Sequence, residues 1–383
     1  MSSSSTAPDW PAIRAQFAAT EGQAYLNSAT YGPPPRPVAE AVLAAHAEWT
    51  RGHGDWSAWE GAGERARAAF ARLIGAPRET VALLPAVSVA AGQVAERLPF
   101  RPGANVVLGG GEFRSNLFAW MVQERRGFEL RVVPFRDGRL TLDDLAGAVD
   151  ARTALVAVSS VQSSNGHRAP LAGLAQLCRE RGARLFVDGT QSAGVLDLPL
   201  EGVDYLAVGA YKWLLSPRGS AYLYVAPDRV GEMDPVFAGW KSPADPHAEY
   251  YGPPLDLAPD ASRFDVSLAW SVWVGAAAAA EFLLELGTPA IEARNLGLAR
   301  RFREGLAPLG LAPLFGEEES SQIVGLRVSD PEAVRASLQD EHVVAAVRGP
   351  YLRASFHCFN DEDDVDRALR ALGRPRGGSP MLG

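Results

Sequence analysis

The most informative part of this chain is the stretch Val203-Asp-Tyr-Leu-Ala-Val-Gly-Ala-Tyr-Lys-Trp-Leu-Leu-Ser-Pro-Arg-Gly219. It contains an apolar run, residues 205–208, followed closely by Lys212. Asp188, which ends a second apolar run, lies 24 residues before this lysine. In an open α/β sheet the ligand crevice lies at the carboxyl ends of the strands, so the amine and the carboxylate are expected to face the same crevice.

Such a pair suits pyridoxal phosphate as a cofactor. A lysine holds the cofactor aldehyde as a Schiff base, and a carboxylate keeps the pyridine nitrogen protonated so that the ring can accept electrons. Lys212 and Asp188 are therefore the candidate catalytic residues. Spacing alone leaves a structural alternative open, in which the lysine caps a strand and the aspartate starts a turn.

A resemblance in sequence favours the cofactor site. The segments Val187-Asp-Gly-Thr-Gln-Ser-Ala-Gly194, Gly209-Ala-Tyr-Lys-Trp213 and Pro217-Arg-Gly219 resemble the cofactor site of the class V aminotransferase and cysteine desulfurase superfamily of fold type I pyridoxal phosphate enzymes. The similarity runs from Tyr25-Leu-Asn-Ser-Ala29 to Leu352-Arg-Ala-Ser355 and Phe359-Asn-Asp-Glu-Asp-Asp-Val-Asp366, nearly the whole chain. It implies pyridoxal 5'-phosphate, a small-molecule amino acid substrate and a homodimer with active sites at the interface.

Short apolar runs alternate with helix-length segments, which predicts an α/β fold with a mostly parallel sheet wrapped by helices. The strand candidates are residues 81–84, 105–108, 130–133, 154–158, 184–187, 205–208 and 221–225. By resemblance to fold type I transferases, we expect residues 31–265 to form a large cofactor-binding domain and residues 266–383 a small C-terminal α/β domain. Residues 1–30 are expected to pack on the small domain. A loop rich in Gly, Pro, Asp and Tyr, residues 237–263, is the candidate specificity element.

Composition narrows the function classes. The chain has 383 residues and is 47% hydrophobic, enough for two domains. A net charge of -8 gives no reason to expect nucleic acid as a partner. The sequence shows no apolar run of membrane-spanning length and no signal peptide, so we expect a cytoplasmic protein without a membrane partner. Its two cysteines, Cys178 and Cys358, show no metal-binding spacing, and we expect no metal.

The phosphate of the cofactor is expected at the start of a helix, where free N–H groups and the helix dipole favour an anion. Val87 and Ser88 follow a strand and fit this position, although Ser88 could instead be a plain N-cap. The superfamily usually has a Gly-Thr-Thr triplet here, and this chain departs from it. The resemblance adds Tyr211 as a second hydroxyl and Trp240 as a contact from the other subunit.

Three residues are expected around the cofactor ring by resemblance. Phe113 takes the position of the stacking aromatic, where the superfamily's desulfurases have a histidine that also moves protons. Ser163 and Gln191 align with residues that contact the phenolic oxygen. The alternatives are an ordinary core aromatic for Phe113 and a polar turn for Ser163.

Substrate recognition in the superfamily relies on an arginine that clamps the α-carboxylate with two parallel hydrogen bonds. Arg353 stands in that motif, and Arg348 is expected to support the clamp or bind a second acidic group. His53 is a further candidate for the substrate pocket, although an isolated histidine is more often structural.

The positions of the two cysteines limit the reactions that this chain is expected to catalyse. No cysteine lies between residues 320 and 353, where a desulfurase has its nucleophile, so a persulfide mechanism is not expected. The pattern resembles the superfamily's carbon-sulfur lyases, including hercynylcysteine sulfoxide lyases, and implies β-elimination from an S-substituted cysteine to pyruvate and ammonia. Alternatives are an aminotransferase or epimerase, a kynureninase-like hydrolase, and a silent binding protein that kept the fold. A nicotinamide enzyme is disfavoured because the GxGxxG fingerprint is missing.

Overall fold

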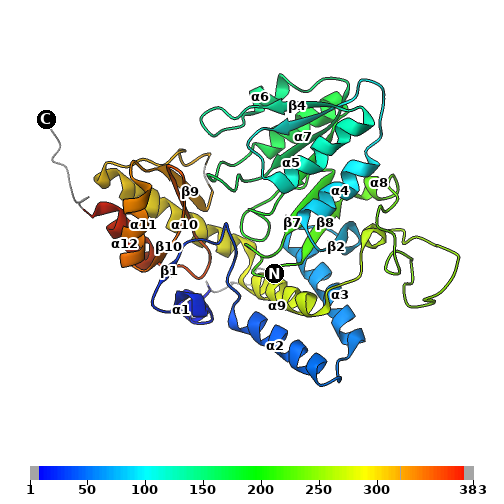
Figure 1. The fold of residues 1–383 in the computed structure, drawn as a ribbon, viewed down its shortest axis with the longest axis horizontal. Coiled ribbons are helices and arrows are strands. Elements are labelled where there is room, and N and C mark those ends of the chain that lie inside the picture. The colour runs from blue at the N-terminus through cyan, green and yellow to red at the C-terminus, as the bar shows by residue number, and fades with distance from the viewer. Residues whose placement is uncertain (1–7, 320, 375–383) are drawn as a thin grey trace, which may run out of the picture.

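The computed structural model describes residues 8–319 and 321–374 (Figure 1). The expected domain limits at residues 1 and 383 lie outside this part of the chain. A seven-stranded sheet forms its centre, in the order β2-β8-β7-β6-β5-β3-β4. Only β8 runs against its neighbours, because its pairs with β2 and β7 are antiparallel and the remaining pairs are parallel. The strands are β2 (Val81–Leu84), β3 (Asn105–Gly109), β4 (Glu129–Val133), β5 (Thr153–Ser159), β6 (Arg184–Asp188), β7 (Tyr205–Gly209) and β8 (Ala221–Val225). The predicted α/β class is thereby confirmed.

Side chains on successive strand positions enter two different cores, which makes the large unit three layers thick. On β5, Val156 and Val158 belong to one buried cluster, whereas Leu155 and Ala157 belong to the other. Helices α3, α7 and α9 contribute to the first cluster and α4 and α5 to the second. This pattern explains the continuous apolar runs in the sequence, because a strand buried on both faces does not alternate with polar residues.

Helices of the large unit cover the sheet, whereas α2 lies farther out, against α9 (Figure 1). The helices of this unit are α2 (Arg36–Thr50), α3 (Trp56–Leu73), α4 (Val87–Arg97), α5 (Arg114–Met121), α6 (Leu142–Ala146), α7 (Leu171–Arg181), α8 (Pro227–Val230) and α9 (Trp270–Leu286). α9 packs against α2 and α3. Residues 237–260 contain no helix and pair only through an isolated bridge between Pro243 and Leu257.

A smaller antiparallel sheet with the order β11-β12-β9 lies toward the C-terminus. Its strands are β9 (Ile323–Arg327), β11 (Ala346–Arg348) and β12 (Tyr351–Ser355), and it packs with α10 (Thr288–Leu306), α11 (Pro331–Asp340) and α12 (Glu362–Gly373). The N-terminal segment joins this unit, because β1 (Ala24–Tyr25) pairs with β10 (Val343–Val344) and Arg14, the last residue of α1 (Trp10–Arg14), forms an ion pair of 2.7 Å with Asp364. The division between residues 265 and 266 stays a prediction.

Among the described residues, no single helix is long and apolar enough to cross a membrane, and the only candidate by composition is the pair α9 and α10, which is bent by 80°.

Candidate active site

A cavity of about 250 Å³ opens at the carboxyl ends of the central strands. We call it the Lys212 cavity. Asp188 ends β6, Gly209 ends β7, and Lys212 follows three residues later. The fold therefore brings the predicted amine and carboxylate together, as expected for the carboxyl edge of a parallel sheet. Eight of the residues predicted for the cofactor line it: Val87, Ser88, Phe113, Ser163, Asp188, Gln191, Tyr211 and Lys212.

Lys212 is almost completely buried, with 7% of its surface exposed. Its Nζ lies 5.4 Å from the centre of the Phe113 ring and 5.6 Å from that of Tyr211, and it donates no hydrogen bond to any described residue. Burial is the main reason that the pKa of this amine is lowered to about 8; the Asp188 carboxylate raises it, and the charges of Arg353, Arg348 and Arg218 lower it. Part of this amine is therefore neutral and nucleophilic near physiological pH, and most of it above pH 8.

Asp188 is a buried carboxylate that accepts a hydrogen bond of 2.9 Å from the backbone N–H of Thr190. Burial raises the pKa of Asp188, whereas the hydrogen bonds from Thr190 and the charge of Lys212 lower it. Thr190 also fixes the next strand, since its Oγ1 accepts from the N–H of Gly209 at 3.0 Å. Thr190 was overlooked in the sequence, although it stands within the segment that carries Asp188.

The N-terminus of α4 faces the same cavity. Val87 is the first residue of this helix and Ala86 is its N-cap, so Ser88 is not the N-cap and that structural alternative is wrong. No described side chain caps α4, which leaves its first N–H groups for an anion. Arg218 also lines the cavity, 5.3 Å from the ring centre of Tyr211. The sequence motif around Pro217 contained Arg218, but only the fold shows that its charge belongs to this site.

Gln191 and Ser163 are held by the protein itself. The side-chain amide of Gln191 donates to the Ala29 carbonyl at 3.2 Å and accepts from the indole N–H of Trp213 at 2.6 Å. The Ser163 carbonyl accepts a hydrogen bond from Arg353. Both side chains line the cavity, and their contact with a phenolic oxygen stays a prediction.

Arg353 is buried beside the cavity and held in place. Its guanidinium donates to the Ser163 carbonyl, to Thr30 Oγ1 at 2.6 Å and to Asn27 Oδ1 at 3.4 Å. Its Nε is buried without a partner among the described residues. Burial lowers the pKa of Arg353 to about 10, and the charge of Arg348 contributes to that shift. An arginine so desolvated, with no carboxylate bonded to it in the described chain, is suited to receive an anion.

Four predicted residues do not line the cavity within the described chain: Arg353 and Arg348, which belong to the small C-terminal sheet, and His53 and Trp240. His53 is exposed in the turn between α2 and α3. Trp240 lies in the loop after α8, where its indole donates to Ser267 Oγ at 2.7 Å. A role for either residue, including a contact from another subunit, stays a prediction.

A buried carboxylate next to the stacking aromatic was missed by the sequence analysis. Glu112 accepts hydrogen bonds from the Ser159 N–H at 2.8 Å and from the side chains of Gln162 at 2.7 Å and Asn116 at 3.1 Å. Burial raises the pKa of Glu112. It ties the segment before Phe113 to the end of β5, and nothing in an isolated Gly-Gly-Glu-Phe segment indicates this network.

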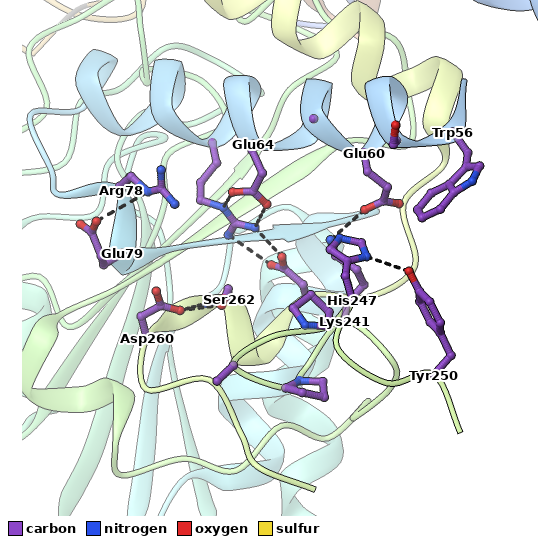
Figure 2. Close-up of a pocket in the computed structure, with 17 residues that line it drawn as sticks. Trp56, Glu60, Glu64, Arg78, Glu79, Lys241, His247, Tyr250, Asp260 and Ser262 are labelled. Atoms are coloured by element: carbon purple, nitrogen blue, oxygen red, sulfur yellow. Dashed lines mark hydrogen bonds and ion pairs between the residues drawn. The ribbon is translucent and has the colours of Figure 1, made fainter. Parts of the chain in front are cut away.

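A second hollow, of about 520 Å³, lies between α3 and the loop after α8 (Figure 2). Glu60 points from α3 toward Lys241 on the loop, and their charged atoms are 2.8 Å apart with both side chains 6% exposed. Glu60 also accepts from the indole of Trp270 at 2.7 Å. The chain has only two lysines, Lys212 and Lys241. Lys241 is already neutralised by the buried Glu60 carboxylate, so this hollow offers no free amine. The ion pair instead fastens the loop to α3.

We expect Lys241→Met to destabilise the protein by about 3–5 kcal/mol, because it leaves the Glu60 carboxylate buried without its cation. Thermal or denaturant unfolding measures this change. The double variant Lys241→Met/Glu60→Gln should recover a large part of the loss, since a neutral amide needs no counter-charge. A double variant as unstable as the single one would contradict the ion-pair explanation.

Comparisons with known proteins agree with this geometry. Residues 25–368 match the family described as Aminotransferase class-V. The chain is 30% identical to isopenicillin N epimerase from Streptomyces clavuligerus, covering 95% of this chain and 98% of that one. It is also 30% identical to a probable cysteine desulfurase from Pseudomonas aeruginosa, covering 96% of each. Among solved structures, the cystine C-S lyase C-DES superposes with a TM-score of 0.85 at 24% identity, covering 94% of this chain and 99% of that one.

Proposed function

This chain belongs to the aminotransferase class-V family and uses pyridoxal 5'-phosphate, and from that premise we propose that it is a carbon-sulfur lyase. The proposed reaction is β-elimination from an S-substituted cysteine, which yields pyruvate, ammonia and a thiol. Bound at Lys212, the cofactor supplies an electron sink that makes the substrate's α-proton acidic. The chain's own residues supply the base, the counter-charges and the carboxylate clamp.

The Lys212 cavity fits this cofactor. The amine that would hold the aldehyde has no hydrogen-bond partner among the described residues, and the carboxylate that would hold the ring nitrogen is buried in the same cavity. The uncapped start of α4, Ser88 and Arg218 provide N–H, hydroxyl and guanidinium groups for a phosphate. Phe113 is half-exposed at the cavity, which leaves its ring face open for stacking.

One observation carries the choice of reaction: the base beside the cofactor position is Lys212, with a pKa of about 8, and neither aromatic next to it is a good acid. Phe113 cannot move protons, and burial raises the pKa of Tyr211. Elimination of a sulfur group needs no further acid, because thiols have pKa values near 8.5 and leave as thiolates. The Lys212 amine takes the Cα proton, the Cβ–S bond breaks with its electron pair on sulfur, and the released enamine takes up water to give pyruvate and ammonia.

The cysteines support the exclusion of a persulfide mechanism. Cys178 and Cys358 are both buried, and burial raises the pKa of each thiol. A nucleophilic cysteine needs the opposite, an accessible site that lowers its pKa. Neither residue therefore suits sulfur transfer.

The competing candidate is an epimerase, favoured by the similarity to isopenicillin N epimerase over 95% of this chain. Inversion at Cα by two bases requires a proton donor on the face opposite Lys212. Phe113 is next to the lysine and is not ionisable, Tyr211 is a weakened acid because burial raises its pKa, and His53 lies elsewhere. We therefore rank elimination above epimerisation and above transamination. A homodimer stays part of the proposal, with Trp240 and His53 as the residues to examine at its interface.

The deciding experiment follows the visible spectrum of the holoenzyme while S-substituted L-cysteines are added, with pyruvate assayed in the same tube. Yellow colour that persists through repeated turnovers, together with pyruvate release, is the expected result. Bleaching with a keto acid product would instead identify an aminotransferase, and accumulation of the D-enantiomer without pyruvate an epimerase. A protein that takes up no pyridoxal phosphate would contradict the lyase, aminotransferase and epimerase hypotheses alike.

We expect the rate of cofactor uptake by the apoenzyme to rise with pH through a midpoint near 8 and then level off. The direction follows from the lowered pKa of Lys212, because the amine is protonated and unreactive below about 8 and neutral above it. Stopped-flow absorbance from pH 6 to 10 gives the profile. A midpoint near that of an ordinary lysine, about 10.4, would show that burial does not tune this amine.

A further inference from the structure

The small sheet β11-β12-β9 turns one face to its own core and the other toward the Lys212 cavity. Leu352, Ala354 and Leu326 lie in the core of this unit. Arg353 points the other way, since it bonds to the carbonyl of Ser163 at the cavity. Because side chains alternate along a strand, residues in register with Arg353 and two positions from it share the cavity-facing side.

A row of exposed side chains stands next to Arg353 on this face. Arg348 on β11 is paired with Tyr351 on β12, and Tyr351 is paired with Arg327 on β9. Residues two positions apart on one strand, such as Tyr351 and Arg353, are separated by roughly 6.6 Å. The row therefore begins about the length of one short side chain from Arg353. The two-residue turn Gly349-Pro350, in which Gly349 has φ 52°, fixes the backbone position of Arg348 at the end of β11.

The charges around the cavity do not balance without a ligand. Arg348 forms no ion pair with any described carboxylate, and its field reaches the site, because it lowers the pKa of both Lys212 and Arg353. A phosphate would offset Arg218, and an α-carboxylate would offset Arg353. Two exposed arginines of the row, Arg348 and Arg327, then remain without a described counter-charge, and Arg348 is the one whose charge reaches Lys212 and Arg353.

Resting on the proposed lyase function, we propose that the substrate carries a second carboxylate on its sulfur substituent, which Arg348 binds while Arg353 holds the α-carboxylate. The substrate class is thus a dicarboxylic S-substituted cysteine. A chain of a few bonds from Cα through sulfur to the second carboxylate spans the separation between the clamp and the row. Arg327 lies at the far end of the row, two strands from Arg348 and thus roughly 9.6 Å from it along the sheet. Arg348, and not Arg327, is among the charges that lower the pKa of Lys212 and of Arg353, so Arg348 is the arginine assigned to the second carboxylate.

The test compares acids with their amides, which have the same shape but no charge. Turnover of S-carboxymethyl-L-cysteine and of S-carbamoylmethyl-L-cysteine is measured as pyruvate released by the holoenzyme. L-glutamate and L-glutamine measure binding through the change in the visible spectrum, which requires no elimination. We expect kcat/KM for the acid to exceed that for the amide by at least about tenfold, because a charge-assisted hydrogen bond is lost in the amide. For the same reason we expect L-glutamate to bind more tightly than L-glutamine.

Arg348→Gln should remove this preference in both assays, whereas Arg327→Gln, the same change on the same row, should preserve it. Equal handling of acid and amide by the unsubstituted protein would overturn the proposal, as would a preference that survives Arg348→Gln. A different outcome would contradict the proposed function alone. If L-glutamate binds more tightly than L-glutamine but neither cysteine derivative yields pyruvate, the site for a second carboxylate stands and the lyase activity does not.

Discussion

Lys212→Ala is expected to lower the rate of pyruvate formation by at least about 10³–10⁴-fold, because the change removes both the covalent anchor of the cofactor and the base that takes the α-proton. Borohydride reduction of the unsubstituted holoenzyme, followed by peptide mass spectrometry, should place the cofactor mass on Lys212. The mapping is unusually clear, since the chain has only one other lysine. In the variant, no cofactor should remain attached after reduction and unfolding.

Two variants separate this effect from a loss of structure. Lys212→Arg keeps a cation in the cavity but cannot form the Schiff base, so it should be as inactive as the alanine variant while remaining folded. Lys241→Met should be less stable yet keep the attached cofactor, because Lys241 lies outside the Lys212 cavity and pairs with Glu60. A reducible adduct that persists in Lys212→Ala would refute the assignment of the anchor.

Asp188→Asn is expected to lower kcat/KM by about 10²–10³-fold while leaving the cofactor attached to Lys212, because the neutral amide cannot hold a proton on the ring nitrogen. The amide oxygen can still accept the hydrogen bond from Thr190, so the local fold should persist. The charge of Asp188 raises the pKa of Lys212. Its removal should therefore also move the midpoint of cofactor uptake below pH 8, a shift that a merely structural role would not produce.

The matched control is Asp265→Asn, at a second buried aspartate, which is paired with Arg67 of α3 and does not line the Lys212 cavity. It should reduce stability without changing the activity of the folded fraction or the uptake midpoint. Full activity of Asp188→Asn, or an unchanged midpoint, would show that the carboxylate does not act on the cofactor.

The chain itself was sufficient to predict the central sheet and the two residues at its edge. Strands that are buried on both faces appear in the sequence as short apolar runs, and strands β2 to β8 coincide with the predicted runs. Lys212 and Asp188 follow such runs directly, and the carboxyl edge of a parallel sheet brings consecutive strand ends together. The assignment of the family likewise needed only local motifs, and the match over residues 25–368 bears it out.

Other features depend on segments that are far apart in sequence, so only the tertiary structure could decide them. Arg353 is fixed by Thr30 and Ser163 from two distant loops, and Arg348 becomes its neighbour through the pairing of β11 with β12. The sequence placed His53 and Trp240 near the site, but the described chain does not bring them to the Lys212 cavity. The lowered pKa of Lys212 has the same origin, because burial and the field of remote charges are properties of the folded molecule, whereas residue type and spacing set only which groups can be brought together.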